Sequence, residues 1–124
     1  MRFKKRIVQI IVFMIACLII NSGCEQNMLT REKIIDIANR EVISRGLQLD
    51  DKEIYYDIDN VKWKDMLSYL RENSPDFAKR YEVLEGRYYQ AIVYSPKDKH
   101  VIGGVLWVFV DRKTGEVITV FGEK

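Results

Sequence analysis

Two segments of the chain place apolar side chains at the spacing of a single helix face. The first segment has Ile34, Ile35, Ala38 and Val42 on that face, and the second has Trp63, Met66, Leu67 and Leu70. This spacing predicts helices over residues 31–45 and 62–72, each with one stripe that needs a core to cover it.

Residues with strong end preferences flank both helices. Thr30 is placed as an N-cap, and Gly46 suits the left-handed position that ends a helix. Ser74 and Pro75 end the second helix and can begin one more turn. That turn would have Phe77, Ala78 and Tyr81 on its apolar side.

Much of the remaining chain alternates between apolar and polar residues, as half-buried β-strands do. We expect strands over residues 53–59, 81–84, 87–94, 101–110 and 116–121, with a tight turn at Glu85-Gly86 and a loop over residues 95–100. The strand 101–110 is apolar on both faces, which indicates a central position in a sheet. Its second face must be covered by a helix, by the curl of the sheet or by a partner.

The order of these elements is helix, strand, helix and then a run of antiparallel strands. It predicts an α+β fold, in which the N-terminal helices pack on one side of a curved antiparallel sheet of three to five strands. The length predicts a single domain over residues 30–124.

The N-terminal segment has a different composition from the rest of the chain. Four basic residues, Arg2, Lys4, Lys5 and Arg6, precede an apolar stretch over residues 7–20. This order is typical of a secretory signal peptide. The apolar stretch has 14 residues, fewer than the ~20 that span a bilayer comfortably.

The sequence "GC" at residues 23–24 makes this segment resemble a bacterial lipoprotein signal. The resemblance implies that residues 1–23 are removed as a signal peptide and that Cys24 is lipidated, with acyl chains such as palmitate. Residues 24–29 would be the lipidated tether, and the protein would be anchored to a membrane of the bacterial cell envelope, on the exported side. Asn21 departs from the family pattern, which has an aliphatic residue there. Cys17 is a rival acceptor, and an ordinary signal peptide that leaves Cys24 as a free thiol is a further alternative.

Removal of this segment would change the sign of the net charge. All 18 acidic residues lie at or after Glu25, whereas four of the 20 basic residues lie in the signal. The remaining 16 basic and 18 acidic residues give a formal net charge of −2 in place of +2. Because no block of Lys or Arg remains to neutralise phosphates, nucleic acid is excluded as an expected partner.

The C-terminal half carries the segments "YEVLEG" and "GGVLWVFVDRKTGEVI". It resembles small bacterial immunity proteins with a nuclear transport factor 2-like (cystatin-like) fold. The matching residues are Tyr81, Val83, Gly86, Gly103, Gly104, Asp111, Gly115 and Val117. The turn "DRKTGEV" at residues 111–117 also resembles PepSY-type domains, which are thought to restrain peptidases. A structural alternative assigns Gly103 and Gly104 to a bend in a curved sheet, and Asp111 and Gly115 to a turn.

Few residues are suited to catalysis. His100 is the single histidine, and it lies in a Lys-rich loop, so neither a zinc site nor a Cys–His pair is expected. We therefore predict no enzyme activity, no cofactor and no metal. Asp57 and Asp59 would share a solvent-exposed strand face with Tyr55, and this acidic and aromatic patch suits a basic protein partner.

Three functions from different classes remain open. The chain can be a lipid-anchored, non-catalytic protein-binding module, immunity-like or inhibitor-like, whose partner is a toxin or a peptidase. It can be a small-ligand carrier or a degenerate enzyme of the nuclear transport factor 2-like superfamily. It can also be a structural lipoprotein of the envelope. We prefer the first.

Overall fold

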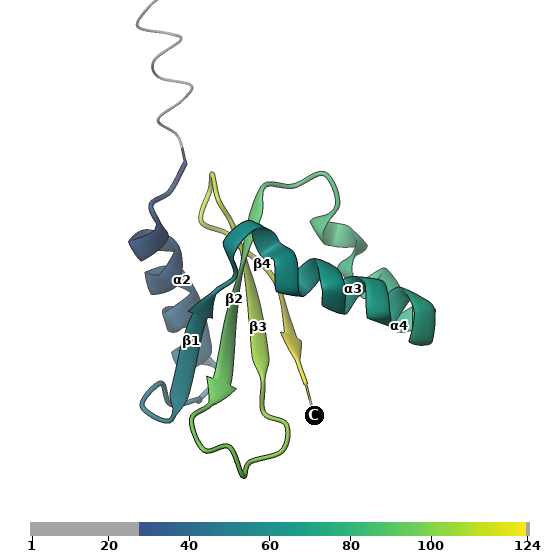
Figure 1. Ribbon diagram of the computed structural model, residues 1–124. Helices are drawn as coiled ribbons and strands as arrows, with labels where there is room; N and C mark the ends of the chain where they lie inside the picture. Colours follow the sequence, from purple (N-terminus) through teal and green to yellow (C-terminus); the bar gives the residue numbers. More distant parts are fainter. Residues whose placement is uncertain (1–27, 124) are drawn as a thin grey trace, which may run out of the picture.

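The computed structural model describes residues 28–123 as a four-stranded antiparallel sheet with helices on both faces (Figure 1). The elements are α2 (Arg31–Ser44), β1 (Lys52–Tyr56), η1 (Ile58–Asn60), α3 (Val61–Asn73), α4 (Pro75–Ala78), η2 (Lys79–Leu84), β2 (Tyr89–Pro96), β3 (Leu106–Asp111) and β4 (Val117–Gly122). The strands lie in the order β1-β2-β3-β4, and every neighbouring pair is antiparallel. The predicted α+β class is confirmed.

Helix α2 begins and ends at the residues that the sequence indicates. The Thr30 side chain accepts a hydrogen bond from the backbone N–H of Lys33 at 3.2 Å. At the other end Gly46 has a φ of 80°, and the N–H of Leu47 donates back to the carbonyl of Val42 at 3.3 Å. These bonds satisfy backbone groups that have no partner within the helix.

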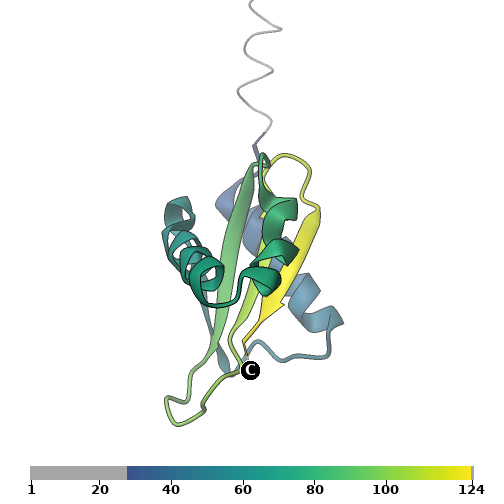
Figure 2. The same cartoon turned by 90° about the vertical axis from the view of Figure 1, so that its right-hand side faces the viewer.

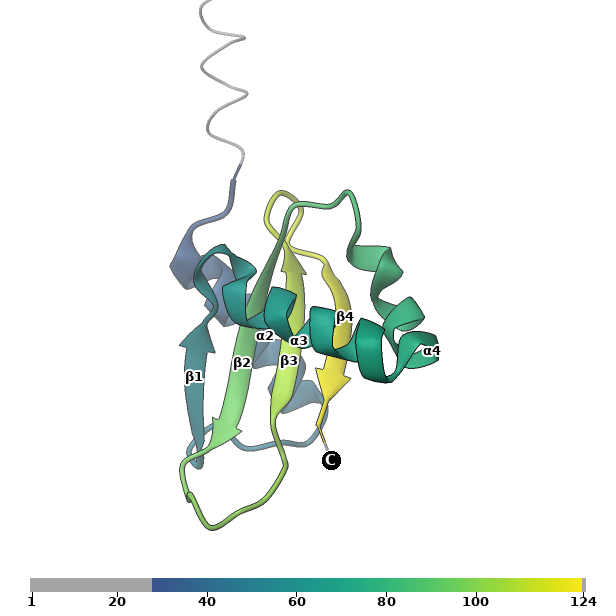
Figure 3. The same cartoon turned by 45° about the vertical axis from the view of Figure 1, so that its right-hand side comes forward.

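Helix α2 covers one face of the sheet, and α3, α4 and η2 lie on the other (Figures 2 and 3). The two faces therefore carry two separate cores. One core contains Ile34, Ala38 and Val42 of α2 with Ile92, Tyr94, Val108 and Val110 of the sheet. The other contains Trp63, Leu70, Ala78, Tyr81 and Leu84 with Ala91, Val93, Trp107, Phe109 and Phe121. The prediction that the helices gather on one side is therefore wrong. Because β2 and β3 are apolar on both faces, each face needs its own helical layer.

None of the five predicted strands has the predicted limits in the structure. The strand predicted over 87–94 is β2, Tyr89–Pro96, and the one predicted over 116–121 is β4, Val117–Gly122. The strand predicted over 53–59 ends at Tyr56. Residues 81–84 belong to the 3₁₀ helix η2, whose three-residue turn places both Tyr81 and Leu84 in the core. The strand predicted over 101–110 begins only at Leu106.

The N-terminal end of the described chain joins the sheet beside the β3–β4 turn, where the N–H of Leu29 donates to the carbonyl of Arg112 at 2.8 Å. The long connection between β2 and β3 lies at the opposite end of the sheet (Figure 1). No helix within residues 28–123 is long and apolar enough to cross a membrane. The predicted signal peptide, Cys24 and the rival Cys17 lie outside the described residues.

Candidate functional site

The first predicted binding residue, Asp57, is not on an exposed face. Its side chain is buried, with 1% of the residue exposed. The two carboxylate oxygens accept backbone N–H groups in the first turn of α3, from Lys62 at 3.1 Å and from Trp63 at 2.9 Å. A negative charge at this end of a helix is favourable. The prediction that Asp57 and Asp59 share a solvent-exposed strand face is wrong, because Asp57 anchors α3.

Asp59 and Asn60 turn the chain between β1 and α3. Both have left-handed backbone angles, with φ of 57° and 55°. The Asn60 amide accepts the N–H of Ala91 at 2.8 Å and donates to the carbonyl of Tyr89 at 2.9 Å. It thus continues the pairing of β2 beyond the end of β1. Asp59 remains exposed at this corner, away from the buried carboxylate of Asp57.

A buried amide ties this corner to the β3–β4 turn. Gln90 is fully buried, and its Nε2 donates to the carbonyl of Asp57 at 2.6 Å. Its Oε1 accepts from the guanidinium of Arg112 at 2.7 Å, and Arg112 also donates to the Tyr56 hydroxyl at 3.3 Å. The sequence signal for this role is the one polar residue within the apolar strand "YYQAIVY".

Asp111 and Gly115 form the β3–β4 turn, as the structural alternative expects. Asp111 Oδ1 accepts the backbone N–H of Lys113 at 2.8 Å and of Thr114 at 2.9 Å, and Gly115 has a φ of 77°. Arg87 donates to Asp111 Oδ2 at 2.9 Å. These contacts hold the turn without leaving the Asp111 carboxylate available to a ligand.

The same contacts predict a pH dependence. The hydrogen bond from Thr114, helped by Arg87 and Lys113, lowers the pKa of Asp111 from 3.8 to about 2 although burial opposes this. Because the folded pKa is the lower one, ionised Asp111 stabilises the fold above pH 4, and this stabilisation is lost as the pH falls toward 2. Urea unfolding at several pH values between 5 and 2.5 should show a steeper loss of stability for the wild type than for Asp111→Asn, which keeps the turn acceptor but has no charge. Parallel curves would contradict this assignment.

Gly103 and Gly104 do not bend a strand, contrary to the prediction. Both lie in the β2–β3 connection, before β3 begins, and have left-handed φ values of 82° and 76°. His100 is exposed in the same connection. In the described part of the chain, no group of three or more His, Cys, Asp or Glu residues is arranged to hold a metal ion.

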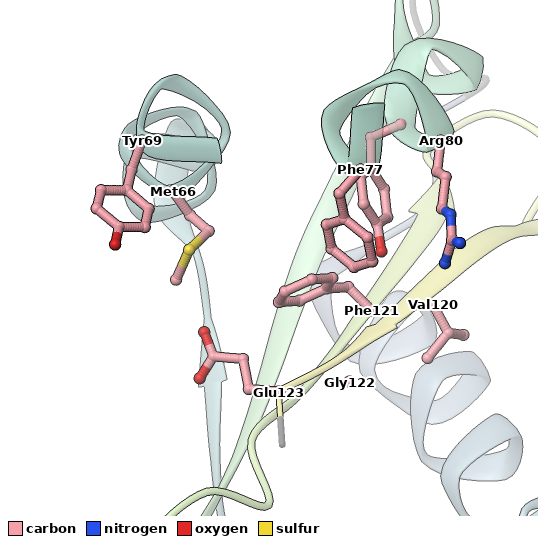
Figure 4. Close-up of a pocket in the computed structure, with 9 residues that line it drawn as sticks. Met66, Tyr69, Phe77, Arg80, Val120, Phe121, Gly122 and Glu123 are labelled. Carbon is pink, nitrogen blue, oxygen red and sulfur yellow. The ribbon is translucent and has the colours of Figure 1, made fainter. Parts of the chain in front are cut away.

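A groove runs along α3, on the face of the sheet opposite α2. Three hollows form it, and each shares lining residues with the next. The hollow at the β1 end shares Lys62 and Trp107 with the middle hollow. The middle hollow shares Met66 and Tyr69 with the hollow at the β4 end. The hollow at the β4 end lies between α3, α4, η2 and β4 (Figure 4). Its volume is about 830 Å³. We call this continuous feature the α3 groove.

One row of side chains crosses all four strands at the floor of the α3 groove. The register places Tyr55, Val93, Trp107 and Phe121 directly opposite one another in turn. Tyr55, at the β1 end, is 42% exposed, and Tyr69, on the α3 wall, is 61% exposed. The groove therefore has an apolar floor with tyrosines accessible from solvent.

The cationic and the acidic side chains of the α3 groove differ in the contacts that they make. Lys62 Nζ lies 4.0 Å from the ring centre of Tyr55, and the Arg80 guanidinium lies 5.0 Å from that of Phe77. The acidic residues of the groove are Glu53 at the β1 end, Asp65 in the middle and Glu123 at the β4 end. Within residues 28–123, none of these three carboxylates forms an ion pair.

The structure thus brings one of the three predicted binding residues, Tyr55, into the groove. Tyr69 was missed, although the sequence holds a signal for it. Lys62 and Tyr69 stand at helical spacing from Met66, which lies at the edge of the core stripe of α3. An edge of this kind is half-covered by the sheet, and its exposure depends on how the helix crosses the strands.

No protein-family model, curated protein or solved structure matches this chain significantly. The resemblance to immunity proteins and to PepSY-type domains therefore stays a prediction, and the function is inferred from the site.

Proposed function

We propose that this protein is a lipid-anchored bacterial lipoprotein whose domain binds a protein partner in the α3 groove and acts by occlusion, without catalysis. The observation that carries the proposal is the pair of accessible tyrosines, Tyr55 at one end of the groove floor and Tyr69 on the α3 wall, beside Trp107. Tyrosine and tryptophan side chains contribute much of the binding energy of protein interfaces. The partner class that fits an immunity-like or inhibitor-like module is a toxin or a peptidase.

The anchor would place the domain close to a membrane of the cell envelope. Cys24 precedes Leu29 by five residues, which span at most about 17 Å when extended. Leu29 joins the sheet beside the β3–β4 turn. That end of the domain would then face the membrane, and the β2–β3 connection would point away from it.

The anchor predicts a defined mature mass. When the full-length chain is produced in bacteria, intact mass spectrometry of the membrane fraction should show a protein that begins at Cys24 and carries two or three acyl chains, because more than one chain is needed for stable anchoring. Cys24→Ala should abolish this mass, whereas Cys17→Ala should not. A mature protein without lipid would contradict the anchor.

Binding in the α3 groove is tested by site-specific photo-crosslinking. We expect p-benzoylphenylalanine at position 69 of the full-length chain to capture a partner protein in the cells that produce it. Position 88 is the matched control, since Tyr88 is 60% exposed and lies outside the groove, whereas Tyr69 is 61% exposed. Equal capture at both positions, or none at position 69, would contradict the proposed site.

A further inference from the structure

We infer that the occupant of the α3 groove is a cationic amphipathic α-helix of the partner, about three turns long, lying beside α3. This inference rests on the proposed function and adds the chemistry of the bound segment. It follows from the direction of the groove, from its length and from the placement of its carboxylates.

The direction of the groove favours a helix over an extended peptide. The floor row from Tyr55 to Phe121 crosses the four strands rather than following one of them. An extended segment lying across the strands has no strand edge with which to pair its backbone groups. A helix satisfies its backbone internally and needs only apolar side chains toward the floor.

The length of the groove corresponds to a short helix. Three inter-strand spacings separate β1 from β4, which amounts to about 14 Å. At a rise of 1.5 Å per residue, about 10 residues of helix cover this span. Helix α3 crosses the sheet and leaves the strand ends nearest the β2–β3 connection uncovered on this face (Figure 3). A second helix can therefore pack alongside α3.

Charge determines which helix fits. Glu53, Asp65 and Glu123 lie at the β1 end, in the middle and at the β4 end of the groove. The cations Lys62 and Arg80 are each held over an aromatic ring, so the carboxylates are the groups that remain for a ligand. A helix with apolar residues at i, i+3 or i+4 and i+7, flanked by Lys or Arg, matches this arrangement.

The experiment identifies the segment captured at position 69 by peptide mass spectrometry. We expect an amphipathic sequence with two or more Lys or Arg residues beside its apolar stripe. A synthetic peptide of that segment should bind the full-length chain and gain helicity on binding, as measured by circular dichroism.

Charge-neutral variants test the role of the carboxylates. The triple variant Glu53→Gln, Asp65→Asn, Glu123→Gln should weaken peptide binding about tenfold, in keeping with three ion pairs at a solvent-accessible surface. The matched triple variant Asp50→Asn, Glu72→Gln, Glu82→Gln removes three exposed acids outside the groove, and it should bind as the wild type does.

The possible outcomes separate this inference from the proposed function. An acidic or extended segment captured at position 69 would overturn the helix and leave the partner-binding groove in place. An unchanged affinity of the groove triple variant would also overturn the inference alone. A second copy of this chain at position 69, or no adduct there, would overturn both.

Discussion

Replacement of Trp63 by Ala is expected to lower the free energy of unfolding by about 3–5 kcal/mol, the usual range for a large buried aromatic residue. Trp63 is fully buried, and its ring lies 4.4 Å from that of Phe109, 5.1 Å from that of Tyr81 and 5.5 Å from that of Trp107 between ring centres. A loss of this size is a large fraction of the about 5–15 kcal/mol by which native proteins are stable. Urea unfolding followed by circular dichroism measures it.

Two variants make this result specific. Trp63→Phe keeps an aromatic ring in the cluster and should lose less stability than Trp63→Ala. Val61→Ala changes a residue of the same helix that is 55% exposed, and it should change the free energy of unfolding by less than about 0.5 kcal/mol. If Trp63→Ala were as stable as Val61→Ala, Trp63 would not be the centre of this core.

Replacement of Asp57 by Ala is expected to cost about 2–3 kcal/mol of folding stability. The variant leaves the backbone N–H groups of Lys62 and Trp63 without their acceptors, and the N–H of Trp63 lies in a buried site. Buried donors without a partner and lost helix caps carry costs of this order. The measurement is again the urea midpoint at neutral pH, with the slope of the transition checked for change.

The neighbouring acid supplies the control for Asp57. Asp57→Asn retains one side-chain acceptor and should lose part of this stability, whereas Asp59→Asn should be nearly neutral. Asp59 is exposed, and asparagine tolerates its left-handed backbone well. Equal effects of the two Asn variants would show that the cap on α3 is not specific to Asp57.

The local sequence was sufficient to predict those structural features whose physical cause is local. Thr30 and Gly46 bound α2 as expected, since capping depends on groups within a few residues of the helix end. The stripe from Trp63 to Leu70 faces the core because its helical spacing permits no other buried face. Asp111 and Gly115 were also predicted from the local sequence, because the hydrogen bonds that form their turn lie within five residues.

Interactions between distant parts of the chain decided the features that the sequence did not predict. Asp57 looks like one of several exposed acids in the sequence, yet it is buried because the short η1 turns the chain from β1 into α3, whose first turn presents two N–H groups to it. Residues 81–84 alternate as a strand would. They form η2 because the aromatic core needs both Tyr81 and Leu84 on one side.

By itself the sequence determined the α+β class, the ends of α2, the turn at Asp111 and the two-faced apolar strand that had to lie inside the sheet. The tertiary structure alone decided that α2 and α3 cover opposite faces, that Asp57 is a structural cap, and that Tyr55 and Tyr69 border one groove. The physical reason is the distance along the chain over which each cause operates. Helix capping and side-chain periodicity are set by residues close in sequence, whereas burial and surface shape depend on which distant segments pack together.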